Sequence, residues 1–279
     1  MIVNADDFGL TSGVNRAIAE LNRAGVLASC TLMARAAATA EAIQIARQTP
    51  GLGVGCHIVL VDGEPVLPPE RIASLADVRT GRLKKTLGGF LKSLMAGRID
   101  AGEMEAEASA QIALLRAEGV ALTHIDTHKH THMFPAVLRP VLRAAREAGI
   151  RAVRNPFEPA WSLDATPGAP WVRRSEVRLL RLLEPVFRRI VADEGFETTD
   201  GAIGVLATGT LDRETVASLL RKLPEGKWEL VTHPGYNDAE LAQAHTRLLA
   251  ARETERDALQ VLKDFPEIEL ERFGTGSAL

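Results

Sequence analysis

The chain has 279 residues, of which 46% are hydrophobic and 25% charged, a composition typical of a globular protein with a sizeable core. Its formal net charge of -3, without a dense lysine–arginine block, argues against a nucleic-acid-binding surface. The sequence has no run of about 18 apolar residues, so no membrane-spanning helix is predicted. It starts without a signal peptide, and we therefore expect a cytoplasmic protein.

Apolar strand-like runs alternate with helical periods along most of the chain. Residues 1–6 are predicted to form a strand, and Thr11 to Ala24 an amphipathic helix that begins at the Thr11 hydroxyl. Cys30 and Cys56 lie in later apolar runs, which predicts buried thiols rather than a disulfide. The elements predicted next are strands at 27–33, 52–60, 120–128 and 150–156, and helices up to about Arg47, at 102–118 and at 134–149.

The segment 156–201 interrupts this alternation, and we interpret it as an insertion or small cap within a single domain that spans residues 1–279. It has prolines and two tryptophans in its first half, then a helix at roughly 174–194. Trp161 and Trp171 are expected to pack in the core of this cap rather than to form a sugar platform. Beyond it we predict strands at 202–209, 227–234 and 268–273, and helices from Asp212 and at about 238–263.

Alternation of this kind is typical of parallel strands joined by crossover helices. About seven to eight such units favour an α/β fold of the irregular (β/α) TIM-like barrel type over an open doubly wound sheet. A dinucleotide-binding fold is disfavoured, because no GxGxxG motif follows the first strand.

Polar side chains occur where several of the predicted strands end. Asp6 and Asp7 end the first strand, His57 lies late in the third, and His128 and His233 lie at the ends of two later strands. Parallel barrels build their sites from the C-terminal ends of strands, so these groups are expected to converge although they are far apart in sequence.

The stretch THIDTHKHTH (123–132) holds four of the seven histidines within nine residues. This density, with Asp126 interleaved, favours metal or proton-transfer chemistry over a structural role. One strand face cannot deliver all of these nitrogens to one ion, so His128, His130 and His132 stay alternatives as ligands. His245, in a polar helical sequence, is expected on the surface.

Two adjacent carboxylates repel each other, and a cation bound to one of them removes this repulsion. One aspartate can bind a divalent ion while the other accepts a proton from water nearby. A carboxylate with two imidazoles leaves coordination positions open for water and substrate. Two imidazoles favour zinc or another transition ion, and a single carboxylate with waters leaves magnesium open.

Four motifs carry a resemblance to a known family: NADDFGLTSGVN at the N-terminus, VGCHIVL, THIDTHKHTHMFP and LVTHPGY. They resemble the YdjC/ChbG-type carbohydrate deacetylases, including the hopanoid-biosynthesis-associated branch. The resemblance implies an irregular (β/α) barrel and the hydrolytic removal of an N-acetyl group from an amino sugar.

The resemblance also implies roles for individual residues. Asp7, His57 and His128 resemble the metal ligands of one divalent ion, and Asp6 the general base that takes a proton from the metal-bound water. His233 resembles the late histidine that protonates the leaving amine. Two further residues are candidates for contacts to the substrate: His132 and Arg154.

The implied partner is an N-acetylated amino sugar, either a chitooligosaccharide or an N-acetylglucosaminyl glycolipid, and related folds are compatible with a homodimer. Two other functions stay open on the residues alone. One is a metal-dependent isomerase or phosphoesterase on the same barrel, and the other is a non-catalytic sugar-binding protein.

Overall fold

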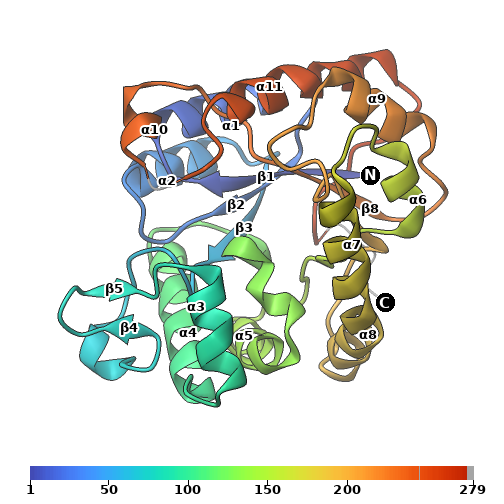
Figure 1. The fold of residues 1–279 in the computed structure, drawn as a ribbon. Coiled ribbons are helices and arrows are strands. Elements are labelled where there is room, and N and C mark those ends of the chain that lie inside the picture. The colour runs from blue at the N-terminus through green and yellow to red at the C-terminus, as the bar shows by residue number, and fades with distance from the viewer. Residues whose placement is uncertain (245, 275–279) are drawn as a thin grey trace.

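The main sheet has six parallel strands in the described part of the chain, in the order β6-β3-β2-β1-β8-β7. The computed structural model describes residues 1–244 and 246–274. The strands of the sheet are β1 (Ile2–Phe8), β2 (Ser29–Leu32), β3 (Gly53–Ile58), β6 (Leu122–Thr127), β7 (Gly201–Ile203) and β8 (Trp228–Thr232). The sheet curls into a half-barrel, the TIM-like arrangement that the alternating pattern predicts (Figure 1).

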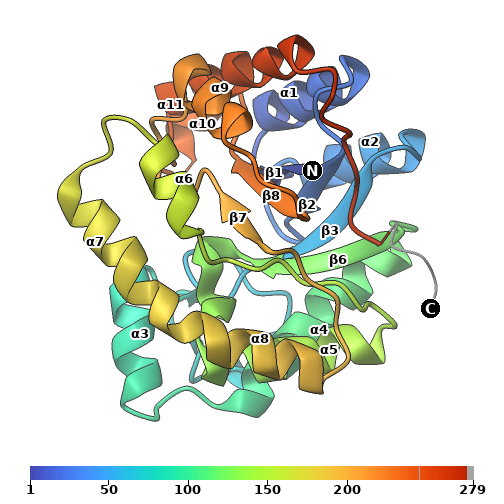
Figure 2. The same cartoon turned by 90° about the vertical axis from the view of Figure 1, so that its right-hand side faces the viewer.

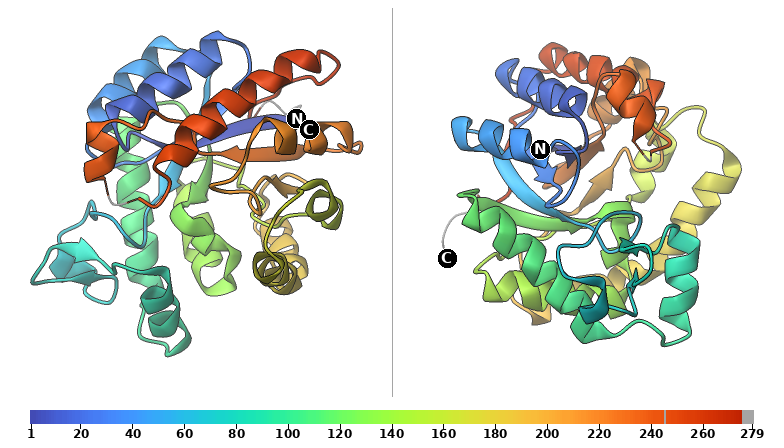
Figure 3. Two further views of the ribbon diagram at one scale, coloured as in Figure 1. Left: turned by 45° about the horizontal axis from the view of Figure 1, so that its top comes forward. Right: turned by 90° about the vertical axis from the view of Figure 1, so that its left-hand side faces the viewer.

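Helices lie on the outer face of the curled sheet (Figure 3). Those between the strands are α1 (Ser12–Arg23), α2 (Thr39–Gln48), α3 (Leu87–Met95), α4 (Ala101–Ala117), α5 (Pro135–Glu147) and α9 (Arg213–Arg221), and those after the last strand are α10 (Ala239–Gln243) and α11 (Ala250–Ala258). Thr11 begins α1 as predicted, because its hydroxyl accepts a hydrogen bond from the Val14 amide. The apolar core lies between this helical layer and the sheet, and it includes the free cysteines Cys30 and Cys56, both buried as predicted.

Residues 70–100, where the sequence lacks a regular pattern, hold small elements at the side of the sheet (Figure 3). A 3-10 turn at Pro69–Arg71 precedes a two-stranded antiparallel ribbon of β4 (Ala76–Asp77) and β5 (Arg82–Leu83). Helix α3 follows this ribbon. The loop before the ribbon is attached to α4, because the buried carboxylate of Glu107 accepts hydrogen bonds from the amides of Val66 and Leu67.

The prediction of seven to eight strands differs from the six that form ladders here. The segment predicted as a strand at 150–156 makes only isolated bridges, Ile125 to Val153 and Ala152 to Glu197. Since these bridges reach two different neighbours, no ladder of consecutive pairs forms on either side. The predicted strand 268–273 likewise reduces to one bridge, between Ile2 and Glu271.

Two other predicted elements end early for local reasons. The strand predicted at 202–209 stops at Ile203, because Gly204 turns the chain at a φ of 87°. The amides of Gly204 and Leu206 donate hydrogen bonds to the Glu158 carboxylate instead of to a neighbouring strand. The long helix predicted at 238–263 is broken into α10, α11 and a 3-10 turn at Leu259–Asp264. Between α10 and α11 the Thr246 hydroxyl accepts from the Leu248 amide, a local bond that competes with helix.

The 156–201 segment contains three helical pieces: α6 (Ala160–Ala165), α7 (Trp171–Leu180) and α8 (Glu184–Asp193), with a 3-10 turn at Arg181–Leu183. Figure 2 shows α7 and α8 running along one side of the molecule, and α8 packs against α5. Trp161 is partly buried and packs edge-on against Trp228 of β8, with ring centroids 5.3 Å apart, so it contacts the main sheet rather than the core of a separate cap. Trp171 is 77% exposed, so the expected core packing is wrong for this residue.

None of the described helices has both the length and the apolar character that a bilayer crossing requires.

Candidate metal centre

A β-bulge in β1 explains how two adjacent aspartates reach the same site. Ala5 pairs with Cys30 and Phe8 with Leu32, so Asp6 and Asp7 together lie opposite the single residue Thr31. Asp7 adopts a left-handed backbone conformation with φ 63°. Successive side chains of a regular strand point to opposite faces, so the bulge removes the alternation that would separate the two carboxylates.

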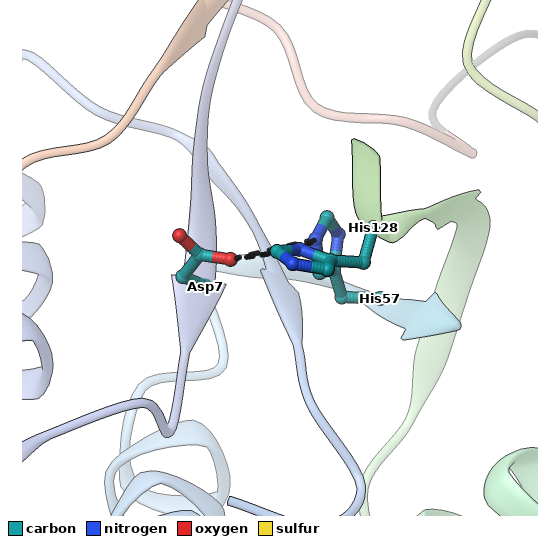
Figure 4. A group of neighbouring side chains, drawn as sticks. All are labelled: Asp7, His57 and His128. Carbon is teal, nitrogen blue, oxygen red and sulfur yellow. Dashed lines mark hydrogen bonds and ion pairs between the residues drawn. The ribbon is translucent and has the colours of Figure 1, made fainter. Parts of the chain in front are cut away.

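Asp7, His57 and His128 converge at the C-terminal ends of β1, β3 and β6 (Figure 4). Oδ1 of Asp7 lies 3.5 Å from Nε2 of His57 and 3.5 Å from Nδ1 of His128. The two imidazole nitrogens are 3.3 Å apart. One oxygen and two nitrogens from three strand ends therefore form a compact triangle of donor atoms.

This triangle fits a cation of the zinc class. Donor atoms of a tetrahedral site with bonds of about 2.0–2.1 Å lie about 3.4 Å apart, close to the separations here. Nδ1 of His57 lies 2.8 Å from Oδ1 of Asp126, a contact that orients the ring and directs Nε2 at the triangle. Burial by itself would lower the pKa of His57, but Asp126 with Asp6 and Asp7 raises it to about 9. A cation that binds to the His57 ring would therefore displace a proton from it.

Asp6 is held by a buried guanidinium. Arg154 donates from Nη1 to Oδ2 of Asp6 at 2.8 Å and from Nη2 to Oδ1 at 2.6 Å. Arg154 also pairs with Asp126 at 2.5 Å and with Glu229 at 2.7 Å, and all four side chains are at most 3% exposed. Burial would raise the pKa of Asp6, yet the Arg154 charge holds it below its usual range, so Asp6 is ionised.

Arg154 also occupies the place of a second cation. Asp6, His57 and Asp126 form another group of donor atoms within 4.8 Å of one another. The guanidinium already lies between the carboxylates of Asp6 and Asp126, within hydrogen-bond distance of both. The described residues therefore offer one open cluster for a metal ion, the triangle of Asp7, His57 and His128.

Helix α11 brings two charged side chains from near the end of the chain to the site. Nη2 of Arg252 donates to Oδ2 of Asp7 at 2.5 Å, on the side away from the oxygen that faces the imidazoles. Glu255 accepts from the His233 amide at 2.6 Å and lies 3.4 Å from its Nδ1. Burial would lower the pKa of His233, but Glu255 raises it, and Nε2 of His233 lies 3.8 Å from Oδ2 of Asp6.

The other histidines of the 123–132 stretch have structural contacts. Both ring nitrogens of His132 are occupied, Nδ1 by the Thr127 hydroxyl at 2.8 Å and Nε2 by the Arg154 carbonyl at 3.1 Å. His124 stacks on Phe273 with ring centroids 4.0 Å apart. His130 has a left-handed backbone with φ 52° and lies outside the triangle, and His245 lies outside the described residues.

Sequence reasoning missed Glu229, Arg252 and Glu255. Glu229 is a charged residue inside an otherwise apolar strand, WELVT, which is a signal for a buried ion pair. Arg252 and Glu255 lie three residues apart on one face of α11, and both are at most 1% exposed. Opposite charges on the buried face of a helix indicate that these side chains position other charged groups.

A curled parallel sheet with a carboxylate–imidazole triangle at its strand ends defines a TIM-like α/β enzyme with one candidate divalent-metal centre. Comparison with known proteins agrees with this class. A sequence profile described as YdjC-like protein matches residues 1–263. The chain belongs to the YdjC-like family of carbohydrate deacetylases.

Individual relatives match the chain over about half or nearly all of its length. A carbohydrate deacetylase of Thermoanaerobacter pseudethanolicus is 29% identical over 269 residues, which are 95% of this chain and 94% of the relative. A chitooligosaccharide deacetylase of Enterobacter sp. strain 638 is 38% identical over 151 residues, 54% of this chain and 57% of the relative. A crystal structure from Enterococcus faecalis V583, provisionally assigned to cellobiose-phosphate cleavage, superposes with a TM-score of 0.77 at 25% identity, covering 97% of this chain and 96% of that one.

Proposed function

We propose that this protein is a metal-dependent hydrolase that removes the N-acetyl group from an acetylated amino sugar. The observation that carries the proposal is the convergence of Asp7, His57 and His128 beside a second, ionised carboxylate, Asp6. The names of the relatives support the same reaction class, since they are carbohydrate and chitooligosaccharide deacetylases.

In this proposal Asp7, His57 and His128 hold the ion, and zinc is the better candidate of zinc and magnesium because two of the three donors are imidazoles. A divalent ion, when bound there, acts as a Lewis acid on the acetamide carbonyl and lowers the pKa of a water molecule. The contact with Asp126 orients the His57 ring. Arg252 binds Oδ2 of Asp7, so that Oδ1 faces the two imidazoles.

The proton steps belong to Asp6 and His233. Asp6 accepts the proton of the attacking water, because Arg154 keeps its carboxylate ionised. A carboxylate held at a lowered pKa passes that proton on readily, and Nε2 of His233 lies 3.8 Å from Oδ2. Glu255 raises the pKa of His233, which suits the imidazolium to protonate the leaving amine.

The substrate class we propose is a chitooligosaccharide or an N-acetylglucosaminyl glycolipid. The chitooligosaccharide deacetylase among the relatives supports the first of these. A phosphoesterase that uses two metal ions is disfavoured, because Arg154 fills the second group of donor atoms. Release of acetate from acetylated amino sugars, measured beside release of phosphate from sugar phosphates, separates the two activities.

The sharpest test is Asp6→Asn, which keeps the size of the side chain and removes its basicity. We expect kcat for acetate release to fall by about 100- to 10,000-fold, while the dissociation constant for Zn²⁺ changes little. Asp193→Asn, at an exposed position on α8, is the matched control. Activity of Asp6→Asn near that of the wild type would refute the role of Asp6, and a metal-reconstituted wild type that releases no acetate would refute the reaction.

A further inference from the structure

Helix α7 has none of its residues buried, although half of them are apolar. Five side chains between residues 171 and 186 account for most of the exposed large hydrophobic residues in the described chain. Their exposed fractions are 77% for Trp171, 47% for Val172, 66% for Leu179, 72% for Leu182 and 43% for Val186. We name this set the α7 stripe. An exposed apolar surface of this kind is typical of an interaction site.

Two arginines of the helix bind backbone carbonyls of the neighbouring chain segments. The guanidinium of Arg174 donates to the carbonyls of Leu163 at 2.5 Å, Thr166 at 2.6 Å and Ala169 at 3.1 Å. Arg173 donates to the Thr208 carbonyl at 2.9 Å and, more weakly, to the Val205 carbonyl. Leu180 is partly buried against the apolar core, but Trp171, Val172 and Leu179 are exposed, which is unusual because a surface helix normally buries its large apolar side chains.

Four of the five residues of the α7 stripe lie along one face of the helical stretch, and Val172 lies beside Trp171. Residues 171, 175, 179, 182 and 186 follow each other at steps of three or four, so their side chains lie one above the other. The helical stretch continues from α7 through the 3-10 turn into α8 (Figure 2). Trp171, Leu179, Leu182 and Val186 therefore form one line of apolar side chains, with Ser175 among them.

The charge of this surface selects its partner. Residues 171–189 contain six arginines and two glutamates, whereas the whole chain has a net charge of -3. Arg178 and Arg189 are exposed and lie four residues before and seven residues after Leu182, at helical spacing from it. A second copy of the chain, related by a two-fold axis through this surface, would oppose two basic patches and repel. An anionic surface is complementary to it.

We propose that the α7 stripe and its flanking arginines dock this protein on an anionic lipid bilayer. A tryptophan and branched aliphatic side chains on one face, with arginines along its edge, match the way an interfacial helix enters the headgroup region. The apolar residues supply burial at the acyl boundary, and the arginines attract anionic headgroups. The protein would lie on the surface, held from one side through the 156–201 segment.

The test is co-sedimentation of the full-length protein with vesicles of phosphatidylcholine alone or with a third of phosphatidylglycerol. We expect about tenfold stronger binding to the anionic vesicles in about 0.1 M salt, and a marked loss of binding in about 0.5 M salt. The fluorescence of Trp171 should shift to the blue on binding. Leu179→Glu with Leu182→Glu should reduce binding at least tenfold, and so should Arg178→Glu with Arg189→Glu.

Two matched controls separate the α7 stripe from general effects. Met95→Glu changes an 82% exposed apolar residue on α3, and Arg221→Glu changes an exposed arginine at the end of α9. Both controls should bind vesicles like the wild type. Equal binding of the wild type to both vesicle types, no binding to either, or equal losses in the controls would overturn the proposal. So would a dimer in light scattering that Leu179→Glu with Leu182→Glu dissociates, since the α7 stripe would then contact a second copy.

Discussion

Each aspartate of the N-terminal pair has its own arginine. Arg154 donates two hydrogen bonds to Asp6, and Arg252 donates one to Oδ2 of Asp7. The two guanidiniums offset the repulsion between the carboxylates, so the pair is stable without further cations. They also separate the tasks of the aspartates, because Arg252 leaves only Oδ1 of Asp7 facing His57 and His128.

Arg252→Met should weaken metal binding without touching any of the three donors. Without the guanidinium, Asp7 is free to turn out of the triangle, and we expect the dissociation constant for Zn²⁺ to rise about 10- to 100-fold. Competition with a chromogenic chelator measures it. Arg256→Met, one turn further along the same helix, where the guanidinium stacks 4.2 Å from the Tyr236 ring, is the control. An unchanged affinity in Arg252→Met would show that Asp7 keeps its orientation without this contact.

At the scale of elements, irregular strands and a broken helix form the site. The bulge in β1 turns Asp6 and Asp7 toward the same face, and a register shift between β3 and β6 precedes the pairing of His57 with Asp126. The break before α11 lets that helix carry Arg252 and Glu255 to the strand ends. Regular versions of these elements would not bring the same atoms together.

The pairing of β3 with β6 depends on a glycine. A Cβ at position 55 would lie 2.5 Å from Cε1 of the His124 ring, which is itself buried against Phe273. Gly55→Ala should therefore lower the free energy of unfolding by about 1–3 kcal/mol, measured by urea denaturation. Gly51→Ala, where no atom lies within 4 Å of the added Cβ, is the control. Equal stability of the two variants would mean that the His124 ring moves aside freely.

At the scale of the whole molecule, the inside of the half-barrel is polar. Buried there are charged and polar side chains from several strands, among them Asn4, Asp6, Thr31, His57, His124, Asp126, Arg154 and Glu229. Such an interior differs from the layers of branched apolar residues usual in TIM barrels. Buried titratable groups link the stability of the fold to pH, because the native and unfolded chains bind different numbers of protons.

His124 makes this linkage measurable. Burial lowers its pKa from 6.5 to about 3, so between these values the unfolded chain binds a proton that the native protein does not. Stability from this residue is therefore complete above pH 6.5 and is lost as the pH falls, at about 1.4 kcal/mol per pH unit. His124→Phe should reduce the slope of unfolding free energy against pH by that amount between pH 6 and pH 4, whatever its effect at neutral pH. An unchanged slope would contradict a neutral, buried His124.

Much of the site could be predicted from single residues, and the reason is topological. The ends of parallel strands meet at one edge, so Asp6, Asp7, His57, His128 and His233 are predicted to converge from their places in the strands. The family resemblance selects Asp7, His57 and His128 among them, and in the structure the nearest side-chain atoms of these three lie within 3.5 Å of one another. Arg154, a predicted candidate for contact with the substrate, lies among Asp6, Asp126 and Glu229 in the structure. Its partners lie on three different strands far away in the sequence, and no local pattern encodes such a pairing.

What the sequence by itself determined is the alternation of strands and helices, the capped start of α1, the four family motifs and the residue types that gather at strand ends. These follow from side-chain periodicity and local hydrogen bonding, which act over a few residues. Only the tertiary structure decided the reduction of two predicted strands to bridges, the use of His132 as a structural contact, the delivery of Arg252 and Glu255 from α11, and the exposure of the α7 stripe. Those outcomes depend on which distant groups satisfy a buried charge or cover an apolar face, and that is settled when the whole chain packs.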